Sequence, residues 1–293
     1  MSSYITRAIT RDGSARIFCT NSTEVVQKAL DIHNTSKTCT AALGRALTAC
    51  SLMGSMLKDK DNSLTLQFRG DGPAGPIVTV SDYKGNVRGY VTNPEVEVLP
   101  NALGKLDVKG VVGEKGYLYV TKDLGLSEPY NGVSPLVSGE IAEDVTEYFS
   151  ASEQTPSACA LGVRVTNEKT VKAAGGFIVQ VMPGADEKTV TAIENNLKLI
   201  GSVSAMLAEG QTTEDIIAAV FFGVEYDLFD EFDTEYLCTC SREKYKRALV
   251  SLPDADIEEL GRTDEPIETV CRFCNSKYVF DLSEIVEARN KNR

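Results

Sequence analysis

The spacing of apolar residues in the first sixty positions changes from the period of a strand to the period of a helix. Residues 4–20 alternate around Asp12-Gly13, a dipeptide that favours a tight hairpin turn. Residues 21–33 and 40–58 instead repeat apolar side chains at helical spacing. We therefore expect a hairpin followed by two helices, the second of them packed closely inside the core.

Between residues 63 and 183 the pattern is mainly that of strands separated by turns rich in Gly and Asn. The expected strands are 64–68, 77–83, 87–92, 117–121, 158–165 and 171–182. One helical run, residues 138–152, interrupts them. Because helices and strands are partly segregated rather than strictly alternating, the chain is expected to be α+β, with a large sheet in a mixed N-terminal domain.

The segment 184–235 combines predicted helices, at 186–209 and 212–222, with an unusual charge pattern. Residues 199–235 contain nine acidic residues and no Lys or Arg. The seven apolar residues of 216–222 need a surface to cover them, while the acids repel one another. Two interpretations stay open: an acidic amphipathic linker docked on the first domain, or a metastable element that binds other proteins when it is released.

Four of the eight cysteines form two close couples in the last fifth of the chain: Cys238 with Cys240, and Cys271 with Cys274. Four thiolates are what a tetrahedral zinc ion needs, and C-x-x-C is a common zinc spacing. A disulfide within C-x-C closes a small, strained ring, and strained disulfides belong to the labile, regulatory class. The remaining cysteines stand singly among apolar residues: Cys19, Cys39, Cys50 and Cys159. We expect one zinc per chain, held by the two couples.

Length and composition indicate a cytoplasmic, globular protein. The 293 residues allow an N-terminal domain (1–183), a helical linker (184–235) and a small zinc domain (236–293). The sequence lacks an 18-residue apolar run and a signal-peptide core, so no membrane partner is expected. The net charge is −12, and the zinc domain lacks the basic face of a nucleic-acid-binding finger, so nucleic acid is not expected either.

Catalytic motifs give little support for an enzyme. Residues 70–75 match G-x-G-x-x-G, but Pro73 and Pro76 remove hydrogen-bond donors, and a strand rather than a helix is expected next. This segment is therefore interpreted as a turn. His33, the only histidine, is expected to cap carbonyls at the end of its helix. No catalytic residue is predicted.

The sequence resembles the heat shock protein 33 family of redox-regulated holdase chaperones. The resemblance runs through most of the chain, and its most specific motif is C-x-C followed by C-x-x-C. The matching stretches are Gly70–Pro76, Gly85–Val91, Tyr130–Gly132, Val137–Asp144, Ser152–Gln154, Ala174–Phe177, Cys238–Arg242 and Cys271–Cys274.

The resemblance implies a zinc-bound, reduced form that is inactive. It also implies that Cys238, Cys240, Cys271 and Cys274 are the zinc ligands. Oxidation is implied to join Cys238 to Cys240 and Cys271 to Cys274, to release the zinc and to unfold the linker, often with formation of a homodimer. The active form is implied to hold unfolding client proteins without ATP. The other four cysteines lie outside the family motif.

Two other classes remain open on the residues themselves. A zinc-ribbon nucleic-acid-binding protein would show salt-dependent RNA binding. A thiol oxidoreductase would use C-x-x-C as a catalytic dithiol at the start of a helix and would turn over a disulfide substrate.

Overall fold

The computed structural model describes residues 3–102, 104–260, 262 and 265–291. The chain divides into two compact units, with the division between Leu237 and Cys238. The segment 184–235, expected as a separate linker, belongs to the first unit. Among the described residues, no helix is long and apolar enough to cross a membrane.

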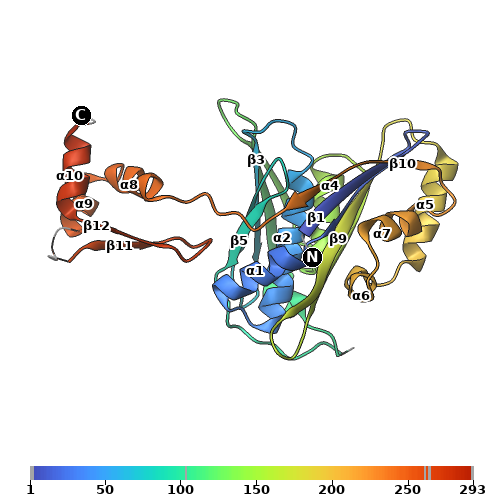
Figure 1. The fold of residues 1–293 in the computed structure, drawn as a ribbon, viewed down its shortest axis with the longest axis horizontal. Coiled ribbons are helices and arrows are strands. Elements are labelled where there is room, and N and C mark those ends of the chain that lie inside the picture. Colours follow the sequence, from blue (N-terminus) through green and yellow to red (C-terminus); the bar gives the residue numbers. More distant parts are fainter. Residues whose placement is uncertain (1–2, 103, 261, 263–264, 292–293) are drawn as a thin grey trace. The chain divides into compact units, whose positions relative to one another are not determined.

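Five antiparallel strands form the first sheet, in the order β10-β1-β2-β9-β8. Figure 1 labels β1, β9 and β10 among them. They are β1 (Ser3–Thr10), β2 (Ala15–Asn21), β8 (Ser157–Val165), β9 (Val171–Val181) and β10 (Tyr226–Thr234). The central strands β2 and β9 are buried along most of their length because both faces of the sheet are covered. One face carries three helices: α5 (Glu187–Leu199), α6 (Val203–Ala208) and α7 (Thr213–Val220).

The second sheet is also antiparallel and has the order β5-β4-β3-β6-β7. Its strands are β3 (Ser63–Gly70), β4 (Ile77–Asp82), β5 (Val87–Val91), β6 (Gly116–Asp123) and β7 (Tyr130–Pro135). The other helices of this unit are α1 (Thr23–His33), α2 (Lys37–Gly54), α3 (Val108–Val112) and α4 (Ala142–Ala151). Among these, α2 packs against strands of both sheets.

Helix α2 is almost completely buried, and small residues let its neighbours approach. A Cβ atom on Gly44 would lie 2.7 Å from a methyl carbon of Val26, and one on Gly54 would lie 2.1 Å from Ser81 Oγ. A larger side chain at either position would therefore force the surrounding elements apart. This helix and the two sheets form the main core of the first unit.

The α+β class is confirmed, as are the hairpin, the two following helices and the six expected strands. The turn at 70–75 joins β3 directly to β4, without an intervening helix. The expected large β-structure of this domain consists of two five-stranded sheets. Strand β7 was not expected, because it contains Gly132 and Pro135, which are unfavourable in strands; as an edge strand it pairs only with β6.

The largest difference from expectation is β10, which is a strand although it lies within the segment expected to be a helical linker. Its residues pair antiparallel with β1. Arg7 of β1 and Arg11, the residue directly after β1, pair with two of its acids. Arg7 Nε lies 2.7 Å from Asp230 Oδ1, and Arg11 Nε lies 3.0 Å from Asp227 Oδ1. The hydrogen bond from Arg7 lowers the pKa of Asp230. Pairing with β1 thus supplies backbone hydrogen bonds and places positive charges beside two of the acids, which reduces the local charge repulsion.

We call residues 226–237 the strap, because they hydrogen-bond to the edges of both sheets. After β10 leaves β1, the backbone N–H of Val87 in β5 donates to Glu235 O at 2.9 Å, and the N–H of Leu237 donates to Val87 O at 2.8 Å. The Tyr236 hydroxyl donates to Gly89 O at 2.8 Å and accepts from Gly89 N at 3.2 Å. His33 Nε2 lies 3.2 Å from the same hydroxyl. The strap is thus fastened two residues before Cys238.

A Tyr236→Phe substitution should loosen the end of the strap. Removing the hydroxyl leaves the Gly89 N–H without this acceptor, which costs about 1–3 kcal/mol for a buried group. We expect the amide of Leu237 to exchange hydrogen at least about tenfold faster than in the unmodified protein. A Tyr117→Phe variant, at a tyrosine 51% exposed on β6, serves as the control. Equal exchange at Leu237 in all three proteins would show that the tyrosine does not fasten the strap.

Candidate metal centre

The second unit is small and has a core of its own. Its elements are α8 (Arg242–Val250), α9 (Asp254–Leu260), β11 (Ile267–Val270), β12 (Lys277–Phe280) and α10 (Leu282–Lys291). Among the described residues the buried apolar side chains of this core are Leu249, Ile257, Ile267, Phe280 and Ile285. A core of this size gives limited stability, and domains this small commonly need a metal or disulfides.

Local structure places each cysteine couple at the end of a secondary-structure element. Cys238 and Cys240 precede α8, where Ser241 caps the helix by accepting a hydrogen bond from the Lys244 N–H at 3.2 Å. Cys271 and Cys274 form the turn between β11 and β12. That turn is closed by a hydrogen bond from Cys271 N to Ser276 O at 2.9 Å.

The four sulfurs converge on one point. All of them lie within 4.8 Å of one another, although they come from sequence positions more than 30 residues apart. Cys238 Sγ lies 3.7 Å from Cys271 Sγ, and Cys240 Sγ lies 3.4 Å from Cys274 Sγ. A tetrahedron with Zn–S bonds of about 2.3 Å has S–S edges of about 3.8 Å. The donor set and its spacing therefore fit a tetrahedral zinc ion.

Polar neighbours of the sulfurs tune their ionisation. Burial raises the pKa of the Cys238 and Cys240 thiols. Burial also opposes ionisation of Cys274, but hydrogen bonds from the hydroxyl and the backbone of Ser276 lower its pKa to about 7. Ser276 Oγ lies 3.2 Å from Cys274 Sγ. Cys274 is thus more ready than Cys238 and Cys240 to act as a thiolate, the form that binds metal and reacts with oxidants.

Two tyrosines border the cluster. Tyr278 Oη lies 3.1 Å from Cys240 Sγ, and this hydrogen bond raises the pKa of Tyr278 to about 12. The ring of Tyr278 stacks on Tyr245 of α8, with ring centroids 5.1 Å apart. The ring pair joins β12 to α8 beside the sulfurs. The C-x-x-C spacing alone could not reveal this contact, because Tyr278 and Cys240 are far apart in the sequence.

The other four cysteines are all in the first unit. None of them belongs to the metal-binding group found among the described residues. Burial raises the pKa of each thiol, that of Cys50 to about 12. These side chains are therefore protonated and poorly reactive near neutral pH.

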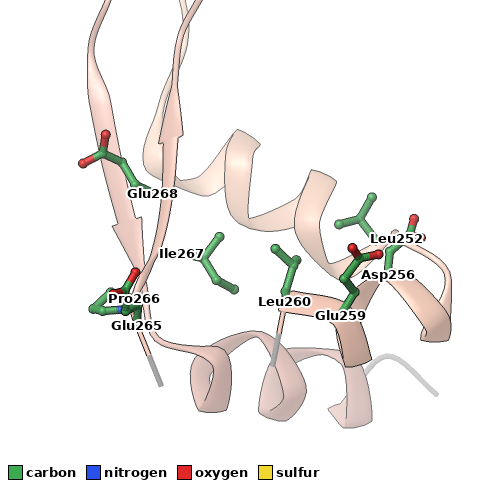
Figure 2. Close-up of a pocket in the computed structure, with 8 residues that line it drawn as sticks. All are labelled: Leu252, Asp256, Glu259, Leu260, Glu265, Pro266, Ile267 and Glu268. Atoms are coloured by element: carbon green, nitrogen blue, oxygen red, sulfur yellow. The ribbon is translucent and has the colours of Figure 1, made fainter. Parts of the chain in front are cut away.

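Figure 2 shows a separate surface hollow of about 470 Å³ in the second unit, which none of the four cysteines lines. Four carboxylates border it, together with Leu252, Leu260, Pro266 and Ile267. The acids are Asp256, Glu259, Glu265 and Glu268. The absence of basic side chains from this lining is unfavourable for a phosphate or nucleic-acid ligand.

Known proteins resemble the whole chain. The family model described as Hsp33 protein matches residues 3–281. The 33 kDa chaperonin of Clostridioides difficile (strain 630) is 47% identical, and the 33 kDa chaperonin of Clostridium novyi (strain NT) is 42% identical; each match covers 98% of both chains. The crystal structure of the 33 kDa chaperonin (heat shock protein 33 homolog) from Thermotoga maritima has a TM-score of 0.90 at 38% identity. It covers 100% of this chain and 99% of that one.

Cys271→Ser should abolish tight zinc binding. Serine is not deprotonated at neutral pH and is a poor zinc ligand, so three thiolates remain. We expect metal analysis of the reduced protein to give one zinc per chain before the change and a large loss of zinc after it. Cys159→Ala, which removes a thiol of the first unit, should keep full zinc content. Retention of zinc at unchanged stoichiometry and affinity by Cys271→Ser would contradict the assignment.

Proposed function

The chain belongs to the Hsp33 family, and from that premise we propose that it is a redox-regulated, ATP-independent holdase chaperone. The observation that carries the proposal is the convergence of four sulfurs in a small unit that begins directly after the strap. In this proposal the reduced form holds one zinc and is inactive. Oxidation of the ligands activates it for binding unfolding client proteins, and it acts in the cytoplasm.

Zinc acts in this proposal as the main support of the second unit. A structural zinc site contributes roughly 10–16 kcal/mol to the folding of small modules. Here the ligands Cys238, Cys240, Cys271 and Cys274 join the segment before α8 to the turn between β11 and β12. When these thiolates are oxidised, the zinc site is lost and only the small apolar core stabilises the unit. The unit is then expected to unfold.

The cysteines themselves carry the redox chemistry. One thiolate of a couple attacks peroxide, the O–O bond breaks, and the sulfur becomes a sulfenic acid while hydroxide leaves as water. The second thiol of the couple then attacks this sulfur, an S–S bond forms and a second water leaves. Each disulfide thus transfers two electrons to one peroxide molecule. We assign the disulfides to Cys238–Cys240 and Cys271–Cys274.

Distance within the folded cluster does not select this pairing. The closest sulfur contacts that the structure gives join one couple to the other, at 3.7 and 3.4 Å. The local pairing is proposed because the metal-bound arrangement is lost as soon as the first ligand is oxidised. After that, only one or two residues separate the members of a couple, while about 30 residues separate the couples. The short tether gives the nearer thiol a much higher effective concentration.

The strap links this chemistry to client binding. Leu237 is bonded to β5, and the next residue is the ligand Cys238. Once the second unit is unfolded, the strap is bounded by a loose chain, and its end is held only by the hydrogen bonds to Val87 and Gly89. The ion pairs of β10 are largely exposed and contribute little. Release of the strap uncovers apolar side chains that now pack on the first unit, including Phe232 and Tyr236.

Apolar surface in the same region supports a role in client binding. Phe222 is 76% exposed and Phe229 is 67% exposed, so the expectation that the whole run 216–222 is buried is corrected. Ile216, Ile217, Val220 and Phe221 of that run are buried beneath the first sheet. The proposed partners are unfolding proteins and, after oxidation, a second copy of the chain. The C-x-x-C couple lies between two strands rather than at the start of a helix, which is unfavourable for a thiol oxidoreductase.

Oxidation should switch on suppression of client aggregation. We expect the reduced, zinc-bound protein to leave the light scattering of a thermally unfolding client unchanged, in the absence of ATP. Protein treated with peroxide at raised temperature should suppress that scattering, and a thiol reductant should reverse the treatment over time. A Cys39→Ala variant should behave like the unmodified protein. Equal suppression before and after oxidation would contradict the proposed switch.

The disulfide assignment can be tested by tryptic mapping of the oxidised protein. Trypsin leaves Cys238 and Cys240 together in peptide 199–242, but cleaves after Arg272, between Cys271 and Cys274. If each couple pairs locally, peptide 199–242 should be recovered unlinked to other peptides, with a mass two hydrogens lower than that of its reduced form. Peptide 263–272 should be recovered joined by a disulfide to peptide 273–277. Peptide 199–242 joined to either of the other two would show pairing between the couples and overturn the assignment.

A further inference from the structure

The outer edge of β8 is open. This strand pairs with β9 on one side only. Among the described residues, the backbone of Leu161–Val165 makes no hydrogen bond to any segment other than β9. An unpaired strand edge presents free N–H and C=O groups that can receive another strand. At about 3.3 Å per residue these five residues offer an edge of roughly 16 Å.

A groove of about 500 Å³ follows this edge. All five consecutive residues of Leu161–Val165 line it, although their side chains alternate between the two faces of the sheet. The groove therefore runs along the edge rather than over one face. Its walls come from α2, from the loop before α3 and from the start of α6: Ala41, Arg45, Gly104, Lys105, Leu106, Ser202, Ser204 and Ala205.

The described residues that line the groove carry only positive charge. Three of them are cationic, Arg45, Lys105 and Arg164, and none of them is an Asp or Glu. This is unusual in a chain with a net charge of −12. Arg45 binds Glu140 through Nη1, but its Nε is buried and has no hydrogen-bond partner among the described residues. The groove thus combines a free strand edge with positive charge: Arg45 is paired with Glu140, whereas Lys105 and Arg164 form no ion pair with the described residues.

We propose that this groove binds an extended, acidic polypeptide segment as an added strand beside β8. Backbone hydrogen bonds supply affinity in this mode, and side chains select the sequence. Charges on an edge strand often serve only to prevent pairing with other chains. Here the charged side chains that line the groove are all positive, so they repel basic segments and attract acidic ones.

At the opposite edge of the same sheet, an acidic extended segment of this chain already pairs as a strand. There the acidic strand β10 pairs with β1, and Arg7 and Arg11 contact its carboxylates. The segment 225–235 of this chain is therefore a suitable probe: it is extended in the structure, and six of its eleven residues are acidic. The groove lies entirely in the first unit and needs neither oxidation nor zinc loss. If the groove does not bind the peptide, the proposed redox switch is unaffected. If the redox switch is disproved, the proposed peptide binding is unaffected.

The test uses the reduced, zinc-loaded full chain and a labelled peptide of residues 225–235 with blocked termini. We expect saturable binding that weakens as salt is added. A peptide with every Asp and Glu replaced by Asn and Gln should not bind. Arg164→Glu, at an exposed side chain, should weaken binding about fivefold to tenfold. Lys172→Glu on β9, which changes the net charge equally and lies outside the groove lining, should leave binding unchanged.

Hydrogen exchange distinguishes strand addition from simple charge attraction. We expect bound peptide to slow amide exchange within residues 161–165, where free N–H groups become paired. Each of three results would overturn the proposal: no binding, equal binding of the neutral peptide, or binding without protection of residues 161–165. If amide exchange changes only at β1 and β10, the peptide has displaced the chain's own strap instead of binding beside β8. That result would also contradict the proposal.

Discussion

The convergence of four cysteine sulfurs is the interaction on which the second unit depends. The sulfurs lie within 4.8 Å of one another, yet the elements that carry them share only a small apolar core and a few surface ion pairs. One pair joins Arg242 to Glu284 on α10, and the guanidinium of Arg242 lies 4.5 Å above the ring of Phe280. Exposed pairs of this kind contribute at most about 1 kcal/mol each, whereas a structural zinc contributes roughly ten times as much. In the proposed mechanism, the state of the sulfurs therefore determines whether this part of the chain is folded.

The first unit has the opposite character. Its two sheets enclose α2 in a large, continuous core, which does not depend on any metal. Only its last segment, the strap, is weakly held: β10 is an edge strand with mostly exposed residues and exposed ion pairs. The chain thus places this exposed edge strand directly before the unit that carries the four cysteines. This arrangement lets a chemical change at the cysteines alter local order in the first unit while the core stays folded.

The sequence predicts those features that depend on nearby residues. The cysteine couples are visible as two short motifs, and α2 is visible as an apolar stripe, because ligands on a turn and residues on a helix face are close in sequence. Strand β10 could not be predicted in this way. Two of its acids pair with Arg7 and Arg11, more than 200 positions earlier, and its β-structure comes from pairing with β1. The contact between Tyr278 and Cys240 and the open edge of β8 also depend on the fold, so no local pattern indicates them.

The central claim is that the metal-holding cysteines control the order of the strap through the folding of the second unit. The most direct test removes zinc with a chelator while a reductant keeps all thiols reduced, and follows amide hydrogen exchange at the temperature at which clients unfold. We expect exchange throughout the second unit and in the strap to become at least about tenfold faster, a change of about 1.4 kcal/mol. Strands β2 and β9 should keep their protection. If the second unit loses its protection while the strap retains it in full, the two are not coupled and the account is wrong.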